Sequence, residues 1–118
     1  MKMKKNLPDK TEILLYTSPN GDVRVEVFFQ DETVWLTINK MAELFQVTKQ
    51  NISYHIQNIY QEKELDKNST VKEILTVQFE GGREIKRNLD YYNLDSIIAV
   101  GYRVNSFQAT QFRIWATK

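Results

Sequence analysis

The sequence predicts an α+β fold: a winged helix-turn-helix-like domain with a β-hairpin before the helices and further helices after the wing. Three observations favour this fold. Two short amphipathic stretches, residues 37–45 and 48–61, are separated by only two residues, which is typical of a helix-turn-helix. Alternating apolar stretches surround Gly81-Gly82 and indicate a β-hairpin in the position of a wing. Another hairpin pattern occupies residues 13–29 near the amino terminus.

The amino-terminal hairpin is predicted from a turn and an alternating strand. Residues 13–16 form its first strand, and residues 18–21, with the sequence SPNG, are typical turn formers. In residues 23–29, valines and a phenylalanine alternate with charged side chains, as in a strand with one buried face. Residues 34–36 form a short strand that leads into the helices. Residues 1–10, with four lysines, form a loose basic amino terminus before a single domain over 11–118.

Each of the two central helices has a capping threonine and an apolar face. Thr37 is the expected N-cap of the first helix, and Thr48 is the expected N-cap of the second. Ala42 provides the small side chain that a close helix crossing requires. The side chains expected to point inward are Met41, Leu44 and Phe45 in the first helix and Ile52, Ile56 and Ile59 in the second.

The outer face of the second helix is polar and suited to the major groove of DNA. Between residues 44 and 61 there is no carboxylate to repel phosphate. Amide side chains bond adenine edges, lysine reaches guanine or phosphate, and hydroxyl groups contact phosphates. The candidate DNA-binding residues of this helix are Lys49, Gln50, Asn51, Ser53, Tyr54 and Gln57.

The turn between these helices departs from the usual pattern. A helix-turn-helix commonly has glycine there because one residue takes a left-handed conformation. This chain has Gln46, so the turn is either strained or built differently. The alternative interpretation of residues 37–61 is a pair of amphipathic helices that only complete a small core.

The second hairpin supplies candidate backbone contacts. Leu75, Val77 and Phe79 alternate before the glycines, and a second alternating series follows them. The wing of a winged helix lies along the phosphate backbone. Arg83 and Lys86, with Arg87 beside them, are the candidate phosphate contacts, although Glu80 and Glu84 oppose their charge. An ordinary edge hairpin of mixed charge is the alternative.

Two helices are expected after this hairpin. Asn93 caps the first, whose inward face is Leu94, Ile97, Ile98 and Gly101. Ser106 caps the second, in which Phe112 and Trp115 lie on one side. No stop signal follows Trp115, so we expect the chain to be the amino-terminal part of a longer protein.

Composition and charge narrow the class of protein. The 118 residues are 42% hydrophobic and carry a net charge of +1, with no cysteine and no apolar run that spans a bilayer. We therefore expect a cytoplasmic protein without a membrane partner. The charge is uneven: residues 11–80 carry six basic and eleven acidic side chains, and residues 81–118 carry six and three. Because phosphate binding depends on lysine and arginine, we expect modest DNA affinity.

The carboxyl-terminal run is YNLDSIIAVGYRVNSFQATQFRIWATK, and an earlier run is VWLTINKMAELFQVTKQNISYHIQNIYQEKELDKNS. The carboxyl-terminal run closely resembles the RhuM-type virulence-protein family of bacteria, and the earlier run resembles the start of the same family, so the resemblance covers most of the chain from about residue 34. It implies a DNA-binding amino-terminal domain, followed in full-length members by a larger carboxyl-terminal region that is absent here. Many members have glycine in place of Gln46. The resemblance implies bacterial, cytoplasmic, virulence-associated proteins.

Three polar residues in the tail have two possible roles. Arg103, Asn105 and Arg113 either contact a ligand or phosphate, or form a buried polar network in which Arg103 and Asn105 tie the loop between two helices and Arg113 pairs with a carboxylate. We expect no enzyme, metal or cofactor, because His55 is the only histidine and no nucleophile–base spacing is present. The expected partner is double-stranded DNA. The alternative is a docking or homodimer module that uses exposed aromatics at Tyr54, Tyr60, Tyr91 and Tyr92.

Overall fold

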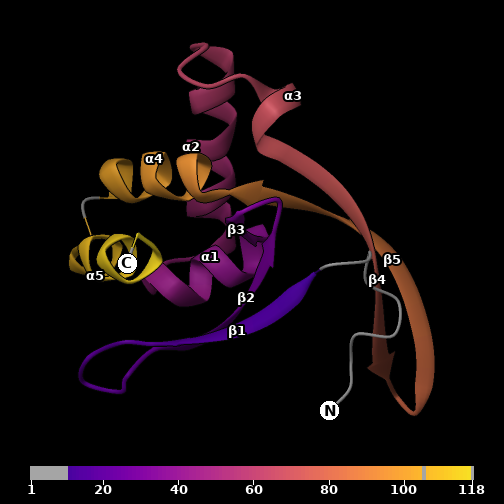
Figure 1. Cartoon of the computed structure of the whole chain (residues 1–118). Helices are drawn as coiled ribbons and strands as arrows, with labels where there is room; N and C mark the ends of the chain where they lie inside the picture. Colours follow the sequence, from indigo (N-terminus) through magenta and orange to yellow (C-terminus); the bar gives the residue numbers. More distant parts are fainter. Residues whose placement is uncertain (1–10, 105, 118) are drawn as a thin grey trace.

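The computed structural model describes residues 11–104 and 106–117, and this part of the chain forms one antiparallel sheet with helices on one face (Figure 1). The α+β class is confirmed. The strands are β1 (Glu12–Thr17), β2 (Arg24–Gln30), β3 (Thr33–Leu36), β4 (Val71–Glu80) and β5 (Arg83–Asn93), arranged in the order β1-β2-β3-β5-β4. The helices are α1 (Ile38–Phe45), α2 (Lys49–Gln61), the single turn α3 (Lys67–Thr70), α4 (Leu94–Val104) and α5 (Phe107–Ala116).

The predicted N-caps of α1 and α2 are confirmed. The Thr37 hydroxyl accepts a hydrogen bond from the Lys40 N–H at 3.2 Å, and the Thr48 hydroxyl accepts one from the Asn51 N–H at 3.0 Å. Gln46 lies in the left-handed region, with φ 60° and ψ 46°. The turn therefore has the conformation that glycine usually supplies, and glutamine adopts it at a cost of about 1 kcal/mol.

The main core lies between the sheet and the helices. All six side chains predicted to point inward from α1 and α2 are buried, and Leu44, Ile52 and Ile59 are fully enclosed. Val25 and Val27 from β2 and Leu36 from β3 form the sheet side of this core. The helical face of the sheet thus fixes the orientation of α2.

The other face of the sheet carries a second, smaller cluster. Trp35, Ile74 and Tyr91 are buried there, with Phe28 and Leu89 partly buried around them. The Trp35 ring N–H donates to the Gln30 carbonyl at 2.8 Å, which satisfies its polar atom. Both faces of the sheet therefore carry apolar side chains.

The second hairpin turns at the predicted glycines, since Gly81 has φ 59° and Gly82 has φ 78°. Its two apolar series lie on opposite faces. Leu75 is opposite Asn88 and Val77 is opposite Lys86, whereas Leu89 is opposite Ile74. The hairpin consequently has no single apolar face toward its tip.

The predicted caps of the last two helices are also present. The Asn93 side chain accepts a hydrogen bond from the Ser96 N–H, and the Ser106 hydroxyl accepts one from the Gln108 N–H. More of the surface of α4 is buried than was predicted, because this helix packs against α2, α5 and the sheet together. Ser96, Ala99 and Val100 are buried, while Ile98 and Leu94 are only partly buried.

Candidate nucleic-acid interface

The outer face of α2 is positioned by the three isoleucines on its inner face. Because Ile52, Ile56 and Ile59 are buried, the residues between them point away from the core. All but one of the six predicted DNA-binding residues of α2 are exposed, and Ser53 is half-buried. Tyr54 is the most prominent aromatic on this helix, with 62% of its surface exposed.

Five of the six line one shallow depression with a volume of about 360 Å³; these are Lys49, Gln50, Ser53, Tyr54 and Gln57. Asn51 lies outside the depression, although its side chain is exposed. The lining contains one cation, two amides and two hydroxyl groups, and no carboxylate among the described residues. Such a surface can form hydrogen bonds with bases and phosphates. It carries no negative charge that would repel phosphate.

His55 lies beside this face, next to Tyr54. Its ring is half-buried and meets the ring of Tyr54 edge-on, with centroids 5.4 Å apart. Within the described ranges 11–104 and 106–117, no group of three histidine, cysteine, aspartate or glutamate residues is placed to hold a metal ion. In the same ranges no helix has the length and apolar content needed to cross a bilayer.

The tip of the β4–β5 hairpin is less basic than its sequence suggests. Arg83 and Lys86 are exposed, as expected for phosphate contacts. Arg87, in contrast, donates from one nitrogen to both carboxylate oxygens of Glu80 at 3.1 Å. Figure 1 shows the tip projecting well away from the helices. The tip and α2 therefore offer two separate polar surfaces.

The tail arginines differ from each other. Arg103 donates to Glu62 and to Glu64, each at 2.8 Å, and so ties α4 to the segment after α2. These hydrogen bonds raise the pKa of the Arg103 guanidinium above its ordinary value. The carboxylate pair predicted for Arg113 as its structural alternative is thus formed by Arg103. Arg113 is exposed on α5 without an ion pair to another described residue, and Asn105 lies outside the described residues.

A hydroxyl network that the sequence did not suggest fixes the carboxyl end of α2. The Tyr60 hydroxyl lies 2.7 Å from the Thr70 hydroxyl and 2.5 Å from the Ser96 hydroxyl. Ser96 is fully buried, so this network satisfies a polar group inside the core. In the sequence, the feature that could have indicated this network is Ser96, a serine one position before the apolar Ile97.

The prediction of four exposed tyrosines was wrong for three of them. Tyr91 and Tyr92 are each only 5% exposed, because β5 places them in the two apolar clusters, and Tyr60 is half-buried. Burial raises the pKa of both Tyr91 and Tyr92, and that of Tyr92 reaches about 12 with a further contribution from the charge of Asp90. The exposed large apolar side chains of the last two helices are instead Tyr102, Phe107 and Ile114.

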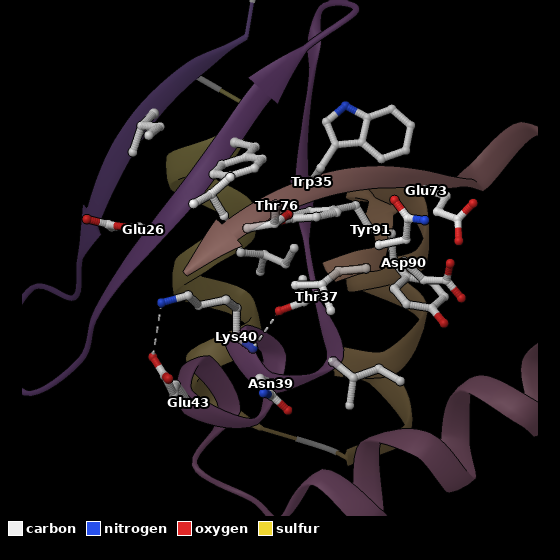
Figure 2. Close-up of a pocket in the computed structure, with 18 residues that line it drawn as sticks. Glu26, Trp35, Thr37, Asn39, Lys40, Glu43, Glu73, Thr76, Asp90 and Tyr91 are labelled. Carbon is white, nitrogen blue, oxygen red and sulfur yellow. Dashed lines mark hydrogen bonds and ion pairs between the residues drawn. The ribbon is translucent and has the colours of Figure 1, made fainter. Parts of the chain in front are cut away.

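A second and larger hollow lies on the sheet side of the molecule (Figure 2). Its volume is about 720 Å³, and strands β1, β2, β3, β4 and β5 and helix α1 contribute to its lining. Its charged lining residues are Glu26, Lys40, Glu43, Glu73 and Asp90. These residues are widely spaced in the sequence, and the sequence prediction did not group them.

The model of the virulence protein RhuM family matches residues 69–118, which include the second hairpin, α4 and α5. The match confirms the resemblance to this family over those residues. Residues 37–61, which contain α1 and α2, lie outside the matched range. The comparison with curated proteins gave no match, and the comparison with solved structures gave none either.

Proposed function

We propose that this chain is a winged-helix DNA-binding domain of a bacterial, cytoplasmic RhuM-type protein. In this proposal α2 enters the major groove and the β4–β5 tip contacts the flanking backbone. The observation that carries it is the outer face of α2, which is exposed, free of carboxylates and held rigidly by its buried isoleucines.

The order of the strands supports the winged-helix assignment. The short strand before the helix-turn-helix, β3, pairs with β5, the second strand of the hairpin that follows it. A winged helix has this arrangement, because its wing strands return to pair with the strand that precedes its two helices. Here α4 and α5 follow the wing and cover the core.

The chemistry of the α2 face supports a division of roles. Gln50, Asn51 and Gln57 carry amides that bond adenine bidentately, whereas Lys49 reaches guanine or phosphate. Ser53 and Tyr54 are suited to phosphate contacts that fix the register. Few cations join them, so we expect micromolar affinity with a shallow salt dependence.

The experiment is fluorescence anisotropy of the purified chain with a labelled random-sequence duplex, titrated at two salt concentrations. Lys49→Ala should weaken binding to all sequences and reduce the slope of log K against log salt by about 1. Lys67→Ala removes another exposed lysine, on α3, and is the matched control. No binding at low salt, or equal losses for the two variants, would contradict the proposal.

Base reading needs a separate measurement. Sequences selected from a random pool should define a preferred site, and Asn51→Ala should lose discrimination at one base pair by about 1–3 kcal/mol. An equal loss of affinity for every sequence would show that Asn51 only contacts the backbone.

The second candidate is a docking or homodimer module that binds no nucleic acid. The exposed apolar residues near the junction of α4 and α5 favour it, since Tyr102 is 77% exposed and Phe107 is 72% exposed. Analytical ultracentrifugation separates the two candidates. A dimer that Phe107→Ser dissociates, in a chain that does not bind DNA, would support docking.

A further inference from the structure

The larger hollow is a cleft between two hairpins that the short strand β3 joins. β3 pairs with β5 only through Trp35–Asn93 and Leu36–Tyr92, and the chain then leaves the sheet to begin α1. Beyond this point the β1–β2 hairpin and the β4–β5 hairpin diverge (Figure 1). The cleft is thus the space into which β3 would continue if it were longer.

One edge of β5 is open along this cleft. Over residues 83–91, β5 pairs with β4 on one side and with no other described strand on the other side. Five consecutive residues of β5, 88–92, line the cleft, which means that the strand meets it with its edge and not with one face. An unpaired edge presents N–H and C=O groups that an extended peptide can bond.

The lining combines apolar side chains with carboxylates. Ile13, Phe28 and Leu89 are half-buried there, and the rings of Phe28 and Tyr91 are stacked with centroids 4.8 Å apart. Four carboxylates and one lysine complete the charged lining, and that lysine, Lys40, lies 4.0 Å from Glu43. Figure 2 shows Glu73 and Asp90 together on one side, with Glu26 and Glu43 on the other.

The pairing of Glu73 with Asp90 is unfavourable for the hairpin by itself. The two residues are directly opposite each other across β4 and β5, so their side chains lie on the same face. Within the described residues neither carboxylate has an ion pair with a basic side chain. Like charges in this position repel, and a cation between them would remove the repulsion.

We propose that this cleft binds an extended, basic segment of a partner protein, which adds as a strand to the open edge of β5. On one face of the added strand, a lysine or arginine of that segment places its charge between Glu73 and Asp90, and on the other face the neighbouring side chains of the segment lie on Leu89 and Phe28. The proposal does not depend on DNA binding. A negative cleft repels phosphate, so the partner and DNA would occupy different faces.

The test uses the full chain and a fluorescein-labelled decapeptide of alternating lysine and threonine as the probe. We expect saturable binding, and Glu73→Gln combined with Asp90→Asn should weaken it about tenfold or more. The matched control is Asp66→Asn combined with Asp95→Asn, which removes two exposed carboxylates outside the cleft and should leave binding unchanged. Equal losses of affinity for the two double variants would show that binding depends only on net charge, and would overturn the proposal.

Strand addition has its own readout. Amide hydrogen exchange should slow at alternate residues of the 83–91 segment when the probe binds, because only every second N–H points to the open edge. A probe with N-methylated threonines keeps its charge but should lose this protection and most of its affinity. Binding without protection of β5 would overturn the strand-addition geometry.

The lysines of residues 1–10 provide the remaining arm of the test. These residues precede β1, whose Ile13 lines the cleft. A variant with Lys2→Ser, Lys4→Ser and Lys5→Ser should bind the probe with unchanged affinity. Markedly tighter binding would show that the chain's own lysines compete for the cleft, and would overturn a partner protein as its occupant.

Discussion

The outer face of α2 and the cleft between the hairpins are both hollowed and polar, but they differ in charge. The depression on α2 has one lysine and no carboxylate among its described lining residues, whereas the cleft has four carboxylates and one lysine. The net charge of +1 conceals this separation. A small domain can therefore present one surface suited to an anion and another suited to a cation.

The two regions also differ in how they are held. The helical side is closely packed, with fully enclosed side chains such as Ile52 beneath the α2 face. The cleft exists because β3 ends after four residues, and its rim carboxylates are exposed. Substitutions of buried residues on the helical side should therefore lower stability, and neutralising substitutions in the cleft should not.

The largest effect is expected for Gly101→Ala, where α4 crosses α5. A Cβ atom at Gly101 would lie 2.5 Å from the Cβ of Ala109, a clash that only a shift of one helix relieves. The gain in helix propensity offsets part of this cost, so we expect a net loss of about 2 kcal/mol. Urea unfolding measures it.

The partner substitution supplies the control. Ala109→Gly removes the opposing methyl group, and the double variant should be less destabilised than the sum of the two single variants. Strict additivity would mean that the two helices separate easily, and that the helical side is no more rigid than the cleft.

Tyr92 lies where the two regions meet, and it should make stability fall at high pH. Its pKa rises from 10.0 to about 12 on folding, mainly through burial and secondarily through Asp90. Because the folded-state pKa is the higher one, this contribution is complete below pH 10 and is lost as the pH rises toward 12. Between pH 9 and pH 11.5 the loss should be roughly 1–2 kcal/mol.

Tyr92→Phe should reduce this alkaline loss and leave stability near pH 7 almost unchanged, since the Tyr92 hydroxyl has no hydrogen-bond partner among the described residues. Burial also raises the pKa of Tyr16 and Tyr91, so part of the loss should remain. Urea titrations at several pH values measure both chains. An identical pH profile for the two would contradict the assignment to Tyr92.

Local patterns in the sequence were sufficient for the elements but not for the cleft. Capping by Thr37 and Thr48 and the turn at Gly81-Gly82 depend on neighbouring residues, so they were predictable. The cleft depends on where β3 stops and on which strand it joins, which are long-range properties. One signal was available: a two-residue turn at 81–82 fixes the register and places Glu73 opposite Asp90.

The α2 face was predictable for the same reason, because one helical period determines which side chains point outward. The helical period therefore also accounts for the grouping of five of these residues in one depression. The burial of Tyr91 and Tyr92, in contrast, could not be predicted in this way. Their burial requires the sheet to have apolar side chains on both faces, and an alternating pattern cannot reveal that.

A smaller effect is expected at Gln46, in the turn that sets the angle of α2. Its positive φ is unfavourable for a residue with a side chain, so Gln46→Gly should stabilise the fold by about 0.5–1 kcal/mol. Gln46→Val should destabilise it, because a β-branched side chain tolerates this conformation least. Thermal unfolding of both variants checks the sign. If α2 keeps its orientation, both variants should bind DNA with the same affinity as the original chain.

The smallest effect, and the one of opposite sign, is expected in the cleft. Asp90→Asn removes the repulsion from Glu73 while keeping the shape of the side chain, so stability should rise by about 0.5 kcal/mol. Asp95→Asn is the control, and it should not stabilise, because Asp95 lies in the first turn of α4, where a negative charge is favourable. If Asp90→Asn instead lowered stability, the carboxylate pair would be part of what holds the hairpin. The cleft carboxylates would then contribute to stability as the packed side chains beneath α2 do, and the difference between the two regions would not hold for Asp90.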